Sequence, residues 1–166
     1  MLKVISVLMI FSAFCVICVK YSVYYNNRLS FTSGCIDMFE SIKNDITFCS
    51  PYYIKALEKS IFYAKGAKDA VLKCIALIKE NVSMYEAFEK SFGDDVSCSG
   101  KTLEIVLEYV KEAGMSDTET EISKINSVIN RLKKERDTQE EFLNTKVANN
   151  RKVIMLIGTT VCVFLI

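Results

Sequence analysis

The sequence predicts an all-α protein, an antiparallel helical bundle of about six helices between N- and C-terminal transmembrane helices. Apolar residues recur at spacings of three and four through most of the chain, which is the helical period. One proline and six glycines leave little room for the turns of an all-β fold. The segments near both ends are apolar and free of charge, as membrane helices are.

The first apolar segment, Val4 to Val19, contains no charged residue. It corresponds to about 24 Å of helix, and counting to Tyr25 gives about 33 Å, enough to cross a bilayer. Lys20 can extend its ammonium group to the interface, where tyrosines are also favoured. A cleaved signal peptide is the alternative, but the Cys18-Val19-Lys20-Tyr21 sequence offers no small-x-small site. We therefore expect a transmembrane helix over residues 1–25.

The second apolar segment, Val153 to Ile166, is shorter, at about 21 Å of helix. A buried core helix is the alternative. Two features favour a membrane segment: Arg151 and Lys152 precede it as an interfacial anchor, and no polar cap follows it. Local thinning of the bilayer would compensate for the short length. We expect a second transmembrane helix over residues 151–166.

Basic residues near the two segments predict the orientation. Lys20 and Arg28 follow the first segment, and Lys146 with the Arg-Lys pair precedes the second, whereas the outer ends offer only Lys3 and the α-amine. The positive-inside rule then places the central domain, residues 26–150, in the cytoplasm. That compartment would keep its cysteines reduced.

The composition of the central part excludes several function classes. Residues 21–152 hold all 20 acidic residues and 19 of the 21 basic ones, a net charge of −1, so no basic surface for nucleic acid is indicated. The sequence contains no His, the commonest general base and metal ligand. No other grouping of nucleophile, base and orienting residue replaces it. We expect no enzyme activity, metal, cofactor or small-molecule substrate.

Pro51 divides the first two helices expected in the central domain. We expect one helix over Thr32–Phe48, because proline disfavours helical backbone in the residue before it. Pro51 suits the first turn of the next helix, which should end before Gly66. The apolar residues of that second helix are Ile54, Leu57, Ile61 and Phe62.

Capping signals divide the rest of the domain. A third helix follows Gly66, and Ser83 with Glu86 forms a capping box for a fourth. Ser99 caps a fifth helix, which ends at Gly114.

A further capping box, Ser116 with Glu119, opens a long helix that meets no breaker before Gly158. We expect the first half of this helix to pack on the domain, and its second half to lead to the bilayer. The apolar residues predicted to be buried in the first half are Ile122, Ile125, Ile129 and Leu132.

Three short motifs suggest ligand sites, and each has a simpler explanation. Ser99-Gly100-Lys101-Thr102 matches the end of a phosphate-binding P-loop, but Asp95 stands where that motif needs glycine. Asn81-Val82-Ser83 matches a glycosylation acceptor, which a cytoplasmic domain would not use. Asp94-Asp95 lacks the further oxygen ligands of a cation site. Helix caps explain the two serines, and a solvated loop explains the aspartates.

Four stretches together resemble the stage III sporulation protein AB family of endospore-forming bacteria. Asp45 to Pro51 resembles the family's acid-Ile-x-aromatic-x-x-Ser/Thr-Pro stretch, and Met84 to Phe92 lies in the place of a helix that usually carries an aromatic residue. Glu112 to Asp117 resembles its Gly-x-Ser-Asp turn, and Arg151 to Ile166 its terminal anchor. The sequence departs from the family at Glu121, where glutamine is usual.

The resemblance implies a function. The family's domain is similar to the cytoplasmic domain of type II secretion system F proteins, the inner-membrane platform beside a secretion ATPase. This implies a structural platform in the channel between mother cell and forespore, located in the mother-cell-derived membrane around the forespore. Its partners would be other proteins of the stage III sporulation A operon, including a cytoplasmic secretion-type ATPase. A membrane-anchored helical regulator or sensor that binds a signalling partner is the alternative.

The turn from Gly114 to Asp117 is the candidate partner surface, because it joins two helices and projects from the bundle. We select Ser116, Asp117 and Glu119 as possible partner contacts. Purely local roles are the alternative, since Ser116 can cap the long helix and Asp117 interacts favourably with the helix dipole. The exposed face of the long helix from Lys133 to Glu141 is the next candidate.

Overall fold

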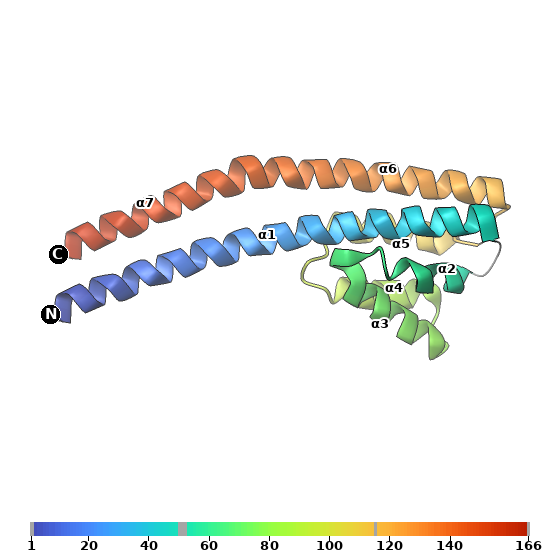
Figure 1. The fold of residues 1–166 in the computed structure, drawn as a ribbon, viewed down its shortest axis with the longest axis horizontal. Helices are drawn as coiled ribbons and strands as arrows, with labels where there is room; N and C mark the ends of the chain where they lie inside the picture. Colours follow the sequence, from blue (N-terminus) through green and yellow to red (C-terminus); the bar gives the residue numbers. More distant parts are fainter. Residues whose placement is uncertain (1, 50–52, 115, 166) are drawn as a thin grey trace. The chain divides into compact units, whose positions relative to one another are not determined.

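The computed structural model describes residues 2–49, 53–114 and 116–165, and every regular element in these ranges is a helix. The all-α prediction is therefore confirmed for this part of the chain. The elements in order are α1 (Leu2–Cys49), α2 (Tyr53–Ser60), the 3-10 helix η1 (Lys65–Ala67), α3 (Lys68–Lys79), α4 (Met84–Gly93), α5 (Gly100–Glu112), α6 (Thr118–Phe142), the π-helix η2 (Leu143–Val147) and α7 (Ala148–Leu165) (Figure 1).

The chain forms two compact units. Unit 1 comprises Met1–Asn26 with Gln139–Ile166, and unit 2 comprises Asn27–Thr138. Helices α1 and α6 each contribute residues to both units. Unit 2 contains the hydrophobic core, whose buried residues all lie between Phe31 and Leu132.

Helix α1 is a single helix of 48 residues. We expected its first 25 residues and the stretch from Thr32 to form separate elements, whereas the helix continues through both. No proline or glycine interrupts the chain before Gly34, so nothing local ends the helix there. The last described residue of α1 is Cys49; the predicted stop at Ser50 and Pro51 lies outside the described residues.

One helical stretch among the described residues, Val7–Thr47, is long and apolar enough to cross a membrane. Its 41 residues correspond to about 62 Å, roughly twice the thickness of a hydrocarbon core. Its longest charge-free part is the one before Lys20, and this part belongs to unit 1. The second transmembrane helix over residues 151–166 stays a prediction.

In unit 1, the first part of α1 and α7 pack antiparallel. Residues near the start of α1 contact the end of α7, and later residues of α1 contact the start of α7 and the end of α6. Gly158 allows this close approach, since a Cβ there would lie 2.9 Å from the Phe14 ring. The contacting pairs are Val7 with Cys162, Phe14 with Gly158, Cys18 with Arg151, Tyr21 with Asn150, and Tyr25 with Phe142.

Aromatic residues of α1 and α4 form the centre of the core in unit 2. Phe31, Phe88 and Phe92 are fully buried. The ring centroids of Phe31 and Phe92 are 5.5 Å apart in an edge-to-face arrangement, and those of Phe88 and Phe92 are 5.1 Å apart. Such pairs contribute about 0.5–1.5 kcal/mol each beyond the area they bury. The second part of α1 is therefore an integral element of the helical bundle.

Two glycines bring α1 against η1. A Cβ at Gly34 would lie 2.7 Å from both Ala64 O and Ala67 N, and a Cβ at Gly66 would overlap the backbone of Ser30. Only residues without side chains allow two backbones to approach this closely. Gly66 thus does more than separate two helices, which was its expected role.

The second helix ends earlier than predicted. We expected α2 to carry Ile61 and Phe62, but its last residue is Ser60. The amides of Tyr63 and Ala64 both donate to Ser60 O, at 2.9 and 3.0 Å, so the chain turns toward the contact with Gly34. The predicted apolar face is consequently wrong at Phe62, whose side chain is 85% exposed.

The other capping predictions are confirmed except at the long helix. Ser83 Oγ accepts from Glu86 N at 3.3 Å, and Ser99 Oγ accepts from Thr102 N at 3.0 Å. Gly114 adopts a φ of +77° after α5, as a glycine that ends a helix does.

Candidate functional site

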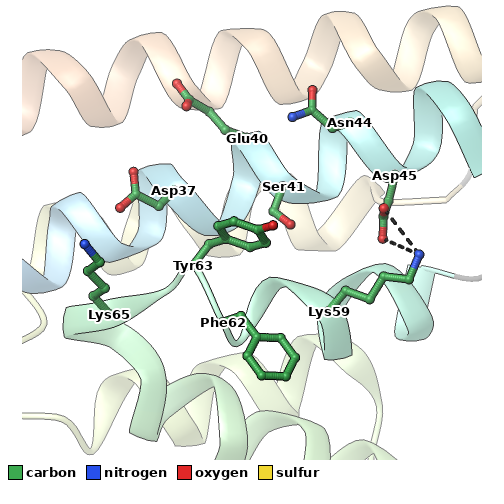
Figure 2. Close-up of a pocket in the computed structure, with 9 residues that line it drawn as sticks. All are labelled: Asp37, Glu40, Ser41, Asn44, Asp45, Lys59, Phe62, Tyr63 and Lys65. Carbon is green, nitrogen blue, oxygen red and sulfur yellow. Dashed lines mark hydrogen bonds and ion pairs between the residues drawn. The ribbon is translucent and has the colours of Figure 1, made fainter.

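A groove of about 670 Å³ lies between α1 and the segment that connects α2 to α3 (Figure 2). Its α1 side consists of residues spaced by three, four, seven and eight positions, which is one face of a helix. Its other side is formed by Lys59 of α2 and by the turn that follows this helix. The lining residues are Asp37, Glu40, Ser41, Asn44, Asp45, Lys59, Phe62, Tyr63 and Lys65.

Two of the three carboxylates in the groove have cationic partners. Lys59 Nζ lies 3.3 Å from Asp45 Oδ2, and Lys133 Nζ of α6 lies 2.8 Å from Glu40 Oε1. Among the residues that the structure describes, no ion pair involves the third carboxylate, Asp37, and none involves Lys65. The groove therefore presents one carboxylate that is not neutralised at contact distance.

The turn after α2 places two aromatic side chains at the groove. Phe62 is 85% exposed and Tyr63 is 58% exposed. Figure 2 shows the Tyr63 ring in the middle of the groove below Ser41, with Phe62 directed away from α1. Neighbouring exposed aromatics are unusual on a surface that has no partner. Aromatic faces beside a carboxylate suit a planar cation such as a guanidinium.

The three predicted partner contacts lie at the start of α6, and none of them lines the groove. The long helix begins at Thr118, and Asp117 Oδ2 accepts from Thr120 N at 3.2 Å. Hydrogen bonds from the side chain and the backbone of Thr120 lower the pKa of the exposed Asp117 carboxyl. Asp117 is therefore the cap, and the prediction that Ser116 caps this helix is wrong by one residue. Ser116 Oγ instead accepts from Lys124 Nζ at 3.0 Å, and Glu119 is exposed in the first turn of α6.

A buried glutamate, Glu121, holds the turn between α5 and α6, and we did not predict it from the sequence. Glu121 is 5% exposed, and its Oε1 accepts from the Tyr109 hydroxyl at 2.6 Å and from Gly114 N at 3.3 Å. Burial, the neighbouring Tyr53 and this carboxylate raise the pKa of Tyr109 well above its ordinary value. Glu121 lies four residues before Ile125, so both side chains lie on the buried face of α6. This spacing is the sequence signal that could have predicted the burial of Glu121.

The residues of the P-loop-like motif belong to a buried polar network. Ser99 Oγ lies 2.8 Å from Thr102 Oγ1, which lies 3.0 Å from Thr32 Oγ1 of α1. Ser99 Oγ is also 3.4 Å from Glu135 Oε1, and Lys101 Nζ lies 3.7 Å from Glu135 Oε2. These contacts join α5 to α1 and α6. The helix-cap interpretation of Ser99 is confirmed.

The side chains that could hold a metal are dispersed. Within the described ranges, no three His, Cys, Asp or Glu residues are grouped as they would be around an ion. Burial raises the pKa of the Cys74 and Cys98 thiols to about 12 in each case, so both are neutral near pH 7.

The comparison with protein families decides the relationship. The model of the stage III sporulation protein AB family matches residues 3–166, essentially the whole chain. The chain belongs to this family. Membership gives the protein a role in stage III of sporulation. Comparisons with the curated proteins and with the solved structures find no match.

The stretches that resemble the family have clear places in this family member. Met84 to Phe92 forms nearly all of α4, which supplies Phe88 and Phe92 to the core. Of the stretch from Glu112 to Asp117, Glu112 ends α5, Gly114 N donates to Glu121 Oε1, and Asp117 directly precedes α6. These two stretches therefore fall on the core and on one of its turns, whereas Arg151 to Ile166 lies in unit 1. Of the four stretches, only Asp45 to Pro51 reaches the groove, through Asp45.

Proposed function

We propose that the protein is a structural membrane component of the secretion-like channel complex needed for endospore formation. The match to the family over residues 3–166 carries this proposal. The helical stretch from Val7, which is long and apolar enough to cross a membrane, supports a membrane location. The resemblance further implies the mother-cell-derived membrane around the forespore.

The proposed role of unit 2 is to dock a cytoplasmic secretion-type ATPase. Unit 2 has its own core, so it can present a fixed surface to a partner. The basic residues that follow the apolar stretch, Lys20 and Arg28, support a cytoplasmic location of this unit. The family resemblance implies a domain like that of the type II secretion platform proteins, and hence an ATPase as the partner.

We further propose that the protein acts by binding and not by catalysis. The two buried glutamates of α6, which are the strongest candidates for acid–base chemistry, are engaged in the fold. Glu121 holds Tyr109 and the turn before α6, and Glu135 contacts Ser99 and Lys101.

Co-purification from sporulating cells tests the platform. A full-length tagged chain, extracted in mild detergent, should retain the secretion-type ATPase and other proteins of the same operon. Cells that lack the protein should fail to assemble this complex and should arrest at stage III. An intact complex in those cells would refute a structural platform. If the complex then assembles but is inactive, a regulator or sensor explains the arrest better.

A further inference from the structure

We propose that the groove between α1 and the Phe62–Tyr63 turn binds an arginine-bearing segment of the partner protein, with the guanidinium between Asp37 and the Tyr63 ring. The inference rests on the proposed function in one respect, because it requires that unit 2 docks a protein.

The charges of the groove favour a cation near Asp37. Lys59 pairs with Asp45 at one end, and Glu40 pairs with Lys133 of α6. Lys65 is the other lysine that lines the groove, and with Arg136 and Lys133 it acts on Asp37 from a distance, but among the described residues no ion pair joins any of these cations to Asp37. Asp37 therefore keeps its hydrogen-bonding capacity for a group supplied from outside.

The aromatic residues favour arginine over other cations. A guanidinium can stack on the face of Tyr63 while its N–H groups reach a carboxylate, whereas an ammonium is a compact and strongly hydrated charge. Phe62 lies at the rim with 85% of its surface exposed, so an apolar residue beside the arginine would cover it. Tyr, Phe and Arg are also the residues enriched at the centres of protein interfaces.

Other occupants fit the groove less well. An anionic lipid surface would meet the unpaired Asp37 carboxylate, while Lys59 and Lys133 are already engaged by Asp45 and Glu40. A second copy would have to supply an arginine, but in unit 2 Arg131 is paired with Glu108 at 2.7 Å, Arg136 is paired with Asp137 at 2.8 Å, and the Nε of Arg28 is buried. A different protein that carries an available arginine fits the groove best.

Site-specific photo-crosslinking in sporulating cells tests this inference on the full-length protein. A benzophenone amino acid replaces Phe62, which keeps an aromatic ring at the rim and leaves Asp37 and Tyr63 intact. The same probe at Tyr85, an exposed aromatic of α4 that does not line the groove, is the matched control. We expect one crosslinked protein from Phe62 only, through a peptide that contains arginine beside the crosslinked residue.

Charge exchange identifies the contact. Asp37→Arg should reduce the crosslink by about tenfold or more while the amount of protein is unchanged, and Arg→Asp in the crosslinked peptide should restore it. Asp37→Asn should give an intermediate loss. A crosslink to lipid or to a second copy, a peptide without arginine, or a crosslink that survives Asp37→Arg would overturn the proposal.

Failure of the groove and failure of the platform are distinguishable. If the ATPase co-purifies with the wild-type chain but Phe62 gives no crosslink, the groove inference is wrong and the platform stands. If Phe62 crosslinks to an arginine-bearing peptide of a protein outside the channel, the groove inference stands and the ATPase partner is wrong.

Discussion

Replacing Gly34 by alanine tests whether the backbone contact between α1 and η1 organises unit 2. The new Cβ would lie 2.7 Å from Ala64 O, 2.7 Å from Ala67 N and 3.0 Å from Gly66 N. All three neighbours are backbone atoms, so no side-chain rotation can relieve the overlap. Gly93→Ala is the control, because its nearest neighbour, a methyl carbon of Leu103, is 3.8 Å away.

The two substitutions should change stability in opposite directions. Alanine gains about 0.5–1 kcal/mol over glycine inside a helix, whereas forcing an added methyl group into a packed interior costs about 1–3 kcal/mol. At Gly34 the second effect prevails, and we expect a net loss of about 1–2 kcal/mol. At Gly93 only the helical gain applies, reduced because this residue ends α4.

Thermal unfolding of residues 27–138, followed by far-ultraviolet circular dichroism, measures both effects. This fragment contains every residue of the hydrophobic core. For a chain of this size, 1 kcal/mol shifts the melting temperature by roughly 4 °C. We expect Gly34→Ala to melt about 4–8 °C below the parent and Gly93→Ala at or slightly above it. A Gly34→Ala fragment as stable as its parent would refute the close approach of α1 and η1.

Three further predictions concern the core, the orientation and the turn before α6. Ile125→Asp places an unpaired charge in the core and should cost on the order of 3 kcal/mol or more; an unchanged melt of the same fragment would mean that the stripe faces solvent. An impermeant maleimide should label Val96→Cys, an exposed loop position, only after cells are permeabilised, and labelling in intact cells would reverse the proposed orientation. Native Cys98 should react slowly in both cases, because burial raises the pKa of its thiol to about 12. Asp117→Asn with Glu119→Gln should lower the melting temperature and ATPase retention together, whereas a loss of retention alone would identify the turn as an interface.

Local sequence signals predicted most helix boundaries, because the groups that end a helix lie within a few residues of it. The caps at Ser83 and Ser99 and the left-handed Gly114 needed no information from distant parts of the chain. The end of α2 at Ser60 did need such information. The apolar period runs on to Phe62, but the contact between α1 and η1 turns the chain away first.

The candidate site was harder to predict for the same physical reason. The groove combines α1 with the turn after α2, and no spacing in the sequence shows that these segments face each other. The sequence alone indicates that Glu121 and Glu135 are exposed charges of a long polar helix. Their burial is explained only by Tyr109 and Ser99, which the structure places beside them. A buried carboxylate is defined by its partners, which lie on another helix.

The antiparallel contact between the start of α1 and α7 constrains the order in which the protein can assemble during synthesis. The first apolar segment is synthesised before unit 2, whereas its contacts on α7 are synthesised after unit 2. The core residues of unit 2 have all been synthesised once Leu132 is added. Since domains fold as units during synthesis at about 5–20 residues per second, unit 2 can complete its core before the first segment acquires α7. Until then the apolar surface of that segment lacks the cover that α7 gives it.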